Sequence, residues 1–180
     1  MSGGADPRVV DAFRNAMRRY ASTVTILTAA DRSLRHGITA TAVTSVSMDP
    51  PSLLVCVYRK GRFYEVLMSS MRFCVNVLNH NQSDLSAVFS SDASPQERFK
   101  LGSWLTTEDG LSILRSAQAN IICRKAAVFP FGSHSIVVGE VDEVRESGDG
   151  APLLYQNSSY CLSTPKPSTS TLKQHSGHDH

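Results

Sequence analysis

The first hydrophobic pattern along the chain has the spacing of a helix. Asp6 can cap the start of this helix, and Pro7 suits its first turn because it needs no backbone N–H donor there. The positions that share one apolar face are Val9, Val10, Phe13, Met17 and Tyr20. This segment is therefore predicted to be an amphipathic helix that covers the core of the domain.

After residue 20 the hydrophobic pattern becomes that of strands. Apolar positions either alternate with polar ones or form short, nearly continuous runs typical of strands buried on both sides. The predicted strands are 22–29, 38–48, 52–58, 72–79, 119–131 and 132–144, and 151–163 should give a last turn or short helix and an edge strand.

Other segments interrupt this strand pattern. Residues 30–37 have the composition of a hairpin loop, 61–70 and 82–91 predict short helices, and 94–111 is a polar excursion anchored by aromatic residues. Many short strands with two or three helices predict a mainly β fold, a β-barrel with covering helices.

Composition and charge narrow the function. The apolar fraction of 41% is ordinary for a globular domain, and the net charge of +2 is too weak to indicate a nucleic-acid partner. No apolar run reaches the roughly 18 residues of a membrane span, and the N-terminus lacks the pattern of a signal peptide. We expect one domain over 1–163 and a disordered tail over 164–180. The three histidines of that tail, His175, His178 and His180, are not expected to form a metal site.

The cysteines indicate a reducing compartment. Cys56, Cys74, Cys123 and Cys161 form no C-x-x-C pair, and each lies in an apolar or mixed run. Such positions are typical of reduced thiols in a core, which predicts a cytoplasmic protein without disulfides or a structural metal.

The candidate chemistry lies in residues 37–51, GITATAVTSVSMDPP, since common catalytic and phosphate-binding motifs are absent from the chain. The hydroxyl-bearing positions of this run are Thr39, Thr41, Thr44, Ser45 and Ser47. Small side chains with hydroxyls let a flat heteroaromatic ring approach the backbone and bond at its edge. The same alternation also fits a strand with one solvent-facing side, so the residues alone leave both interpretations open.

Six motifs, in order, resemble a known family. They are FRNAMRRYASTVTILTA, HGITATAVTSVSMDPPSLLVCV, FCVNVLNHNQSDLSAVFS, RF at 98–99, GSHSIVVGEV and PLLY, spread from Val10 to Cys161. Their order and spacing are similar to those of the short-chain flavin reductases, the reductase components of two-component flavin-dependent monooxygenases. The resemblance implies the FMN-binding split-barrel fold.

The resemblance also implies an activity and partners. A hydride would pass from the nicotinamide of NADH or NADPH to FMN or FAD, and the reduced flavin would leave for a partner monooxygenase. Such enzymes need no strong general acid or base, which fits a chain without a catalytic triad. Relatives are homodimers with the flavin near the subunit interface.

The resemblance assigns two parts of the small polar run to the flavin. Thr39, Ala40 and Thr41 would line the edge of the isoalloxazine ring through backbone and hydroxyl contacts. Ser45, Val46 and Ser47 would lie along the ring and the ribityl chain.

The segment from Val57 to Phe63 would approach the flavin phosphate. The family often carries several hydroxyl residues here, whereas this chain has YRKGRF. The cations Lys60 and Arg62 flank a glycine in this segment. Its residues are Tyr58, Arg59, Lys60, Gly61, Arg62 and Phe63. Two cations on a permissive backbone offer a physical substitute for the missing hydroxyls.

Further residues are assigned by the same resemblance. His134 matches the histidine that lies over the flavin near the nicotinamide, while Ser133 replaces the usual aspartate, so no adjacent carboxylate favours the protonated imidazole. Arg98 and Phe99 match a pair near the flavin or dinucleotide. Asn76 is either a strand polar group paired to the backbone or a cofactor contact.

Other functions remain open at this level. They are a pyridoxamine-phosphate-oxidase-like enzyme, a flavin-bound reductase of another acceptor such as a corrin cobalt centre, and a non-catalytic flavin- or haem-binding module.

Overall fold

The computed structural model describes residues 5–31, 34–147 and 150–166. Almost all of the predicted tail, including its three histidines, lies outside these ranges. No helix within the described ranges combines the length and hydropathy needed to cross a bilayer.

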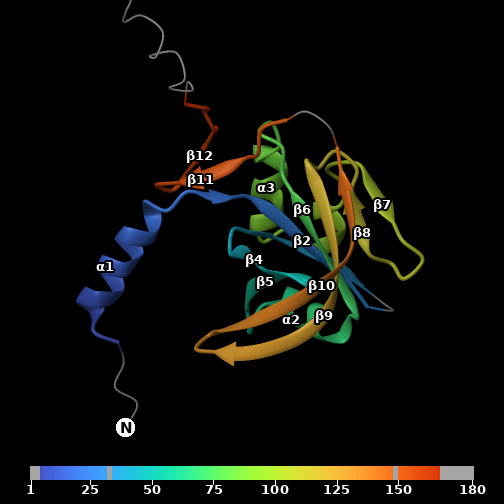
Figure 1. The fold of residues 1–180 in the computed structure, drawn as a ribbon, viewed down its shortest axis with the longest axis horizontal. Helices are drawn as coiled ribbons and strands as arrows, with labels where there is room; N and C mark the ends of the chain where they lie inside the picture. Colours follow the sequence, from blue (N-terminus) through green and yellow to red (C-terminus); the bar gives the residue numbers. More distant parts are fainter. Residues whose placement is uncertain (1–4, 32–33, 148–149, 167–180) are drawn as a thin grey trace, which may run out of the picture.

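One curved antiparallel sheet of seven strands forms the body of the molecule (Figure 1). Its strands are β2 (Thr25–Ala30), β3 (Arg35–Ala40), β4 (Val43–Met48), β5 (Pro51–Tyr58), β6 (Arg72–Val77), β9 (Ala119–Phe131) and β10 (His134–Glu146). The order β3-β2-β6-β9-β10-β5-β4 places two consecutive strands, β3 and β4, at opposite edges. The mainly β prediction is confirmed.

The predicted single strand 38–48 is wrong, because the chain breaks at Thr41–Ala42. The backbone N–H of Val43 donates to the Thr41 carbonyl, and the Ala42 carbonyl accepts from Cys56 N–H. The chain thus leaves its pairing with β2 and starts a new pairing with β5. The sheet curls into a barrel whose seam lies between β3 and β4, since the described residues show no ladder between these strands.

Helices α2 (Arg62–Ser69) and α3 (Ser83–Ser90) cover the core. The largest buried cluster joins Leu27, Val55 and Phe73 of the sheet to Leu67 of α2. A second cluster lies under α3, where Phe89 packs against Phe99 and Trp104, and it includes the anchors predicted for 94–111. That excursion contains α4 (Pro95–Arg98) and β7 (Trp104–Thr106), which pairs with β8 (Ser112–Leu114).

The predicted end of the chain becomes a hairpin. Strand β11 (Leu154–Gln156) pairs with β12 (Ser159–Cys161) and with β1 (Ser22–Thr23). Between β11 and β12, Asn157 and Ser158 have φ angles of 50° and 61°. Two positive φ values in a two-residue loop are the pattern of a type I′ turn, so no short helix forms here.

The loop predicted at 30–37 is shorter than expected, because β3 already begins at Arg35. Two polar side chains made this stretch look like a loop. In the fold, His36 is buried with its ring 5.9 Å from that of Phe63, and the Arg35 guanidinium lies 4.5 Å from the ring centre of Phe99. Their apolar neighbours are distant in sequence.

The prediction that the first helix covers the core is also wrong. Helix α1 (Pro7–Arg18) forms as predicted, and Asp6 caps it by accepting from Arg8 N–H, yet no residue of α1 is buried. Phe13 keeps 66% of its surface exposed. Figure 1 shows α1 projecting away from the sheet. The hairpin holds its end there, because Asn157 N–H donates to the Arg18 carbonyl.

The four cysteines are free thiols, as predicted. Cys74 and Cys123 are fully buried. Burial raises the pKa of the Cys123 thiol to about 12 and raises that of Cys74 as well. Both therefore remain neutral core residues.

Candidate functional site

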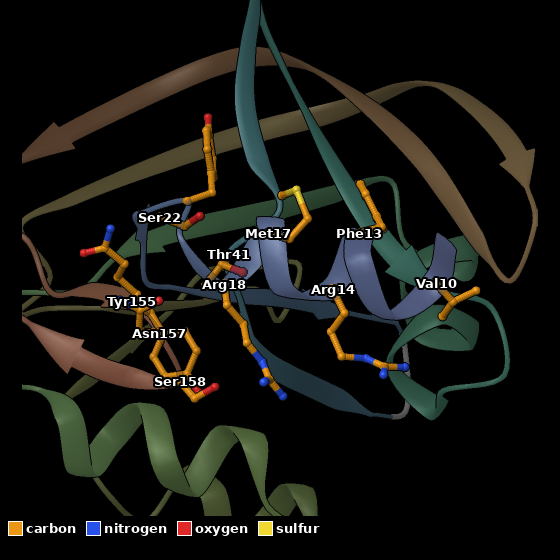
Figure 2. Close-up of a pocket in the computed structure, with 12 residues that line it drawn as sticks. Val10, Phe13, Arg14, Met17, Arg18, Ser22, Thr41, Tyr155, Asn157 and Ser158 are labelled. Atoms are coloured by element: carbon orange, nitrogen blue, oxygen red, sulfur yellow. The ribbon is translucent and has the colours of Figure 1, made fainter. Parts of the chain in front are cut away.

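Thr41 lies where three hollows of the surface meet. It lines a cavity of about 520 Å³ between α1 and the β11–β12 turn, one of about 470 Å³ beside β1 and one of about 260 Å³ below α3. Figure 2 shows the first of these, with Phe13 and Met17 on one side of α1 and Arg14 and Arg18 on the other. The break between β3 and β4 therefore opens onto all three hollows.

The hydroxyls of this region are not equivalent. Thr39 Oγ1 donates to the Ser86 carbonyl of α3 at 2.6 Å, and Thr25 Oγ1 donates to the Ala40 carbonyl at 2.8 Å. Thr41 is exposed, and its hydroxyl has no hydrogen bond to another described residue. Thr39 and Ala40 are thus held by the fold, while Thr41 is available to a ligand.

Strand β4 presents an exposed edge, but its alternation is interrupted. Ser45 pairs with Leu53 and Ser47 with Ser52, so Val46 is the extra residue of a β-bulge. Val46 is 53% exposed as a result. The shared parity of residues 39, 41, 45 and 47 therefore does not place them on one face, since both the break and the bulge change the phase.

Ser47 also has a local role. Its Oγ accepts from Asp49 N–H and donates to the Asp49 carbonyl, both at 3.0 Å. The hydroxyl therefore supports the turn from β4 into β5, and a ligand contact would compete with this pair.

The segment after β5 divides into buried and exposed parts. Val57 and Phe63 lie in the core at 2% exposure, so only their backbone could reach a ligand. Arg59 Nη2 donates to the Gly132 carbonyl at 2.6 Å. Lys60 and Arg62 form no hydrogen bond or ion pair through their side chains within the described chain, and they are the cations left free.

The start of α2 is a ready anion site. Gly61 is its N-cap and provides no side-chain bond to the first turn. Tyr64 N–H of that turn already donates to the Gly61 carbonyl at 2.9 Å, so the N–H groups left for a ligand are those of Arg62 and Phe63. These groups and the helix dipole favour a negative group, although Glu65 also lies in the first turn. The free cations Lys60 and Arg62 flank this position.

Strand pairing brings these parts onto one surface. The bond from Cys56 N–H to the Ala42 carbonyl puts the Thr41–Ala42 break beside the end of β5, where the segment leading to α2 begins. Ser45–Ser47 pair with the other half of β5, roughly 10 Å away at about 3.3 Å per residue. The assigned residues of β3, β4 and the β5–α2 segment thus lie along the seam between the two edges of the sheet.

His134 joins this surface from β10. It pairs with Tyr58 across the β5–β10 ladder, and the two rings lie 5.5 Å apart at 56°. Ser133 Oγ lies 2.9 Å from His134 Nδ1. The fold therefore brings His134 next to the β5–α2 segment, from which it is far separated in sequence.

Comparisons with known proteins agree with this geometry. Residues 17–163 match the family described as "Flavin reductase like domain". The chain is 44% identical to the reductase component of an FADH(2)-dependent resorcinol hydroxylase from Rhizobium sp. (strain MTP-10005), over 85% of this chain and 87% of that one. It is 38% identical to the FMN reductase (NADH) RutF of Pseudomonas syringae pv. syringae (strain B728a), with 80% and 81% covered.

The fold comparison leads to the same family. The crystal structure of a flavin reductase domain protein from Arthrobacter sp. FB24 superposes with a TM-score of 0.82 at 26% identity, covering 89% of this chain and 99% of that chain. The chain belongs to the flavin reductase like domain family. It is therefore an oxidoreductase, and its barrel is the split barrel predicted from the motifs.

The residues of this flavin reductase fit a bound flavin. A phosphate needs N–H donors and cations, which the uncapped start of α2, Lys60 and Arg62 supply. A flat ring needs a thin surface with free backbone groups, and β4 is an edge strand that, among the described strands, pairs only with β5.

Arg98 and Phe99 serve the fold of the reductase. Arg98 Nη1 donates to the Gly37 carbonyl at 2.8 Å, which holds the backbone two residues before Thr39, and Nη2 donates to the Ser91 carbonyl. Phe99 is only 6% exposed. Their predicted contact with the flavin or dinucleotide stays a prediction, whereas their structural role is visible.

Asn76 is the paired strand polar group. It is fully buried; its Nδ2 donates to the Ile26 carbonyl at 2.8 Å, and its Oδ1 accepts from Leu114 N–H and Asn120 Nδ2, both at 2.9 Å. These bonds engage its donor and acceptor groups inside the core and tie β8 to the sheet.

Sequence reasoning missed the residues that complete the hollow below α3. Tyr155 and Tyr160 come from the last hairpin, and Ser86 and Ser90 come from α3. Tyr160 OH donates to Ser86 Oγ at 2.9 Å. Only the pairing of β11 with β1 brings these tyrosines to Thr39, and no local pattern indicates it.

Proposed function

We propose that this chain catalyses hydride transfer from NADH or NADPH to FMN or FAD, and that the reduced flavin then serves a partner monooxygenase. The observation that carries the proposal is the exposed seam between β3 and β4, which ends beside the uncapped start of α2. At one end of the seam, the exposed edge of β4 can contact the flavin ring. At the other end, the start of α2 offers N–H donors and positive charge to the flavin phosphate.

The residues of the chain bind the flavin and orient it toward the nicotinamide. The Thr41 hydroxyl and the free edge of β4 hold the flavin ring at its rim. Lys60, Arg62 and the first-turn N–H groups of α2 hold the phosphate, and His134 covers the ring from β10. Bound flavin supplies the redox chemistry, and the chain contributes alignment of the two substrates at reacting distance.

The relatives support the choice of substrates. The Rhizobium relative is named for an FADH(2)-dependent hydroxylase, and the Pseudomonas relative is named an FMN reductase (NADH). The first assay should therefore include FMN and FAD as well as NADH and NADPH. A monooxygenase is the proposed acceptor of the reduced flavin.

We further propose a cytoplasmic homodimer. The free, buried thiols of Cys74 and Cys123 support a reducing compartment. The apolar face of α1 is exposed, as are Phe129 and Phe131 at the end of β9, and both regions project to the same side in Figure 1. A second copy would cover surface that a monomer leaves in water.

The direct test is oxidation of NADH and of NADPH with FMN, FAD and riboflavin in turn. We expect turnover with at least one pair and bleaching of flavin absorbance when oxygen is excluded. A folded protein that binds flavin tightly but leaves it oxidised in the presence of either nicotinamide would sink the proposal in favour of a non-catalytic flavin module.

A further inference from the structure

The turn between β9 and β10 holds a serine next to the site histidine. Gly132 has a φ of 54°, and Ser133 has no positive φ, which is the pattern of a two-residue type II′ turn. The turn therefore fixes where Ser133 lies relative to His134, the first residue of β10.

Contacts on both sides of the turn hold it in place. The backbone N–H of Arg59 donates to the Ser133 carbonyl at 3.0 Å, and its guanidinium donates to the Gly132 carbonyl. On the other side, the buried Ser135 Oγ donates to Tyr64 OH of α2 at 3.2 Å. The position of Ser133 is thus set by β5 and α2 as well as by its own hairpin.

The Ser133 hydroxyl and His134 Nδ1 form the only hydrogen bond recorded for the imidazole among the described residues. The hydroxyl can donate to Nδ1 or accept from Nδ1–H, and the described residues offer no second acceptor for its proton, which favours donation to Nδ1. When Nδ1 accepts, a neutral imidazole must carry its own proton on Nε2.

We propose that Ser133 is a positioning residue that fixes His134 as the neutral Nε2–H tautomer. His134 then presents a hydrogen-bond donor to a carbonyl oxygen of the bound substrates instead of a basic nitrogen. This inference rests on the proposed function for its substrates, but the tautomer itself is a property of the free protein.

The surroundings do not oppose this state. Tyr58 contacts the imidazole and Arg59 contacts the turn, while Tyr64 of α2 bonds Ser135, the residue that follows His134. None is a carboxylate, so no recorded neighbour accepts a proton from Nδ1 in place of the hydroxyl.

The first test is ¹⁵N NMR of histidine-labelled, full-length protein without ligands at pH 8. We expect the His134 signals of an Nε2–H imidazole in the wild type and in Ser133→Thr, which keeps the hydroxyl. Ser133→Ala should give mixed tautomers, and Ser133→Asp should move the proton to Nδ1 because a carboxylate only accepts. An Nδ1–H imidazole in the wild type would overturn the inference, as would a Ser133→Ala spectrum like that of the wild type.

The second test is kinetic. Ser133→Ala should raise the KM for the nicotinamide substrate by about 3- to 10-fold, the factor for one net hydrogen bond, with a smaller change in kcat. Ser133→Thr should restore the wild-type KM. An unchanged KM in Ser133→Ala would remove the positioning role, whereas a wild type without any turnover would defeat the proposed function and leave the NMR result standing.

Discussion

At the scale of single residues, two neighbouring threonines have separate tasks. Thr39 bonds α3, while Thr41 faces the hollows without a partner in the described chain. Thr41→Val should therefore raise the KM for flavin about 3- to 10-fold at unchanged stability, whereas Thr39→Val should lower the free energy of unfolding by about 1 kcal/mol. Thr106→Val, at an exposed position of β7 that lines none of the three hollows, is the matched control. Flavin kinetics and urea unfolding are measured on all three variants. A flavin KM that rises in Thr39→Val but not in Thr41→Val would contradict the assignment.

Asn76 illustrates a residue whose polarity serves stability. Asn76→Ala removes partners of the Ile26 carbonyl and the Leu114 N–H inside the core. Buried groups left unpaired cost about 1 to 3 kcal/mol each, so these two should lower the unfolding free energy by about 2 to 6 kcal/mol. Urea denaturation checks the value. A loss below about 1 kcal/mol, or a flavin KM that changes while stability does not, would restore the cofactor interpretation.

At the scale of elements, the start of α2 should act on the phosphate alone. The double substitution Lys60→Gln with Arg62→Gln removes two cations beside the uncapped first turn. Charge-assisted hydrogen bonds contribute about 1.5 to 3 kcal/mol, so the KM for FMN should rise by roughly 10- to 100-fold. Riboflavin lacks the phosphate, and its KM should not change. Arg115→Gln with Lys166→Gln removes two exposed cations elsewhere and controls for net charge, and an equal loss for riboflavin would contradict the assignment.

Another pair of elements is joined by charge. Nε and Nη2 of Arg72 at the start of β6 both donate to the Asp109 carboxylate, and this bonding lowers the pKa of Asp109 to about 2. Because the folded pKa is depressed, the stabilisation is present above about pH 4 and is lost as the pH falls toward 2. Both side chains are partly exposed, so the effect should stay below about 1 kcal/mol.

The measurement compares wild type and Asp109→Asn by urea unfolding between pH 7 and pH 3. The difference in unfolding free energy should shrink as the pH falls. Arg72→Gln should remove the same pH-dependent part, and the double variant should add little. A difference that grows toward acid pH would contradict the sign.

The limits of sequence reasoning are clearest in the elements around the site. Local signals were sufficient for α1, α2 and the long strands, since capping and periodicity act within a few residues. The break at Thr41–Ala42 and the bulge at Val46 were not predictable, because small residues fit either a continuous strand or two strands. The competition between pairing with β2 and with β5 decides the outcome, and that competition is tertiary. The resemblance assigned residues on both sides of this break to the flavin, but it did not indicate the break itself.

At the scale of the whole molecule, the free face of α1 leads to a prediction about assembly. Phe13→Glu with Met17→Glu should convert a dimer into monomers, because both exposed apolar side chains would carry charge into the interface. Asn15→Glu adds charge on the same helix away from those positions and should leave the dimer intact. Light scattering after size exclusion measures the mass. A wild-type monomer that binds flavin would refute the homodimer.

The seam between β3 and β4 has a consequence for the release of reduced flavin. Within the part of the chain that the structure describes, β4 pairs with a neighbouring strand on one side only, and most of its residues are exposed. Strands of this kind open locally at far lower free energy than the core strands around Phe73. We therefore expect amide hydrogens of β4 to exchange with solvent much faster than those of β6. A reductase that must give up its product to another enzyme can then release it by fraying one edge, while the barrel behind that edge stays folded.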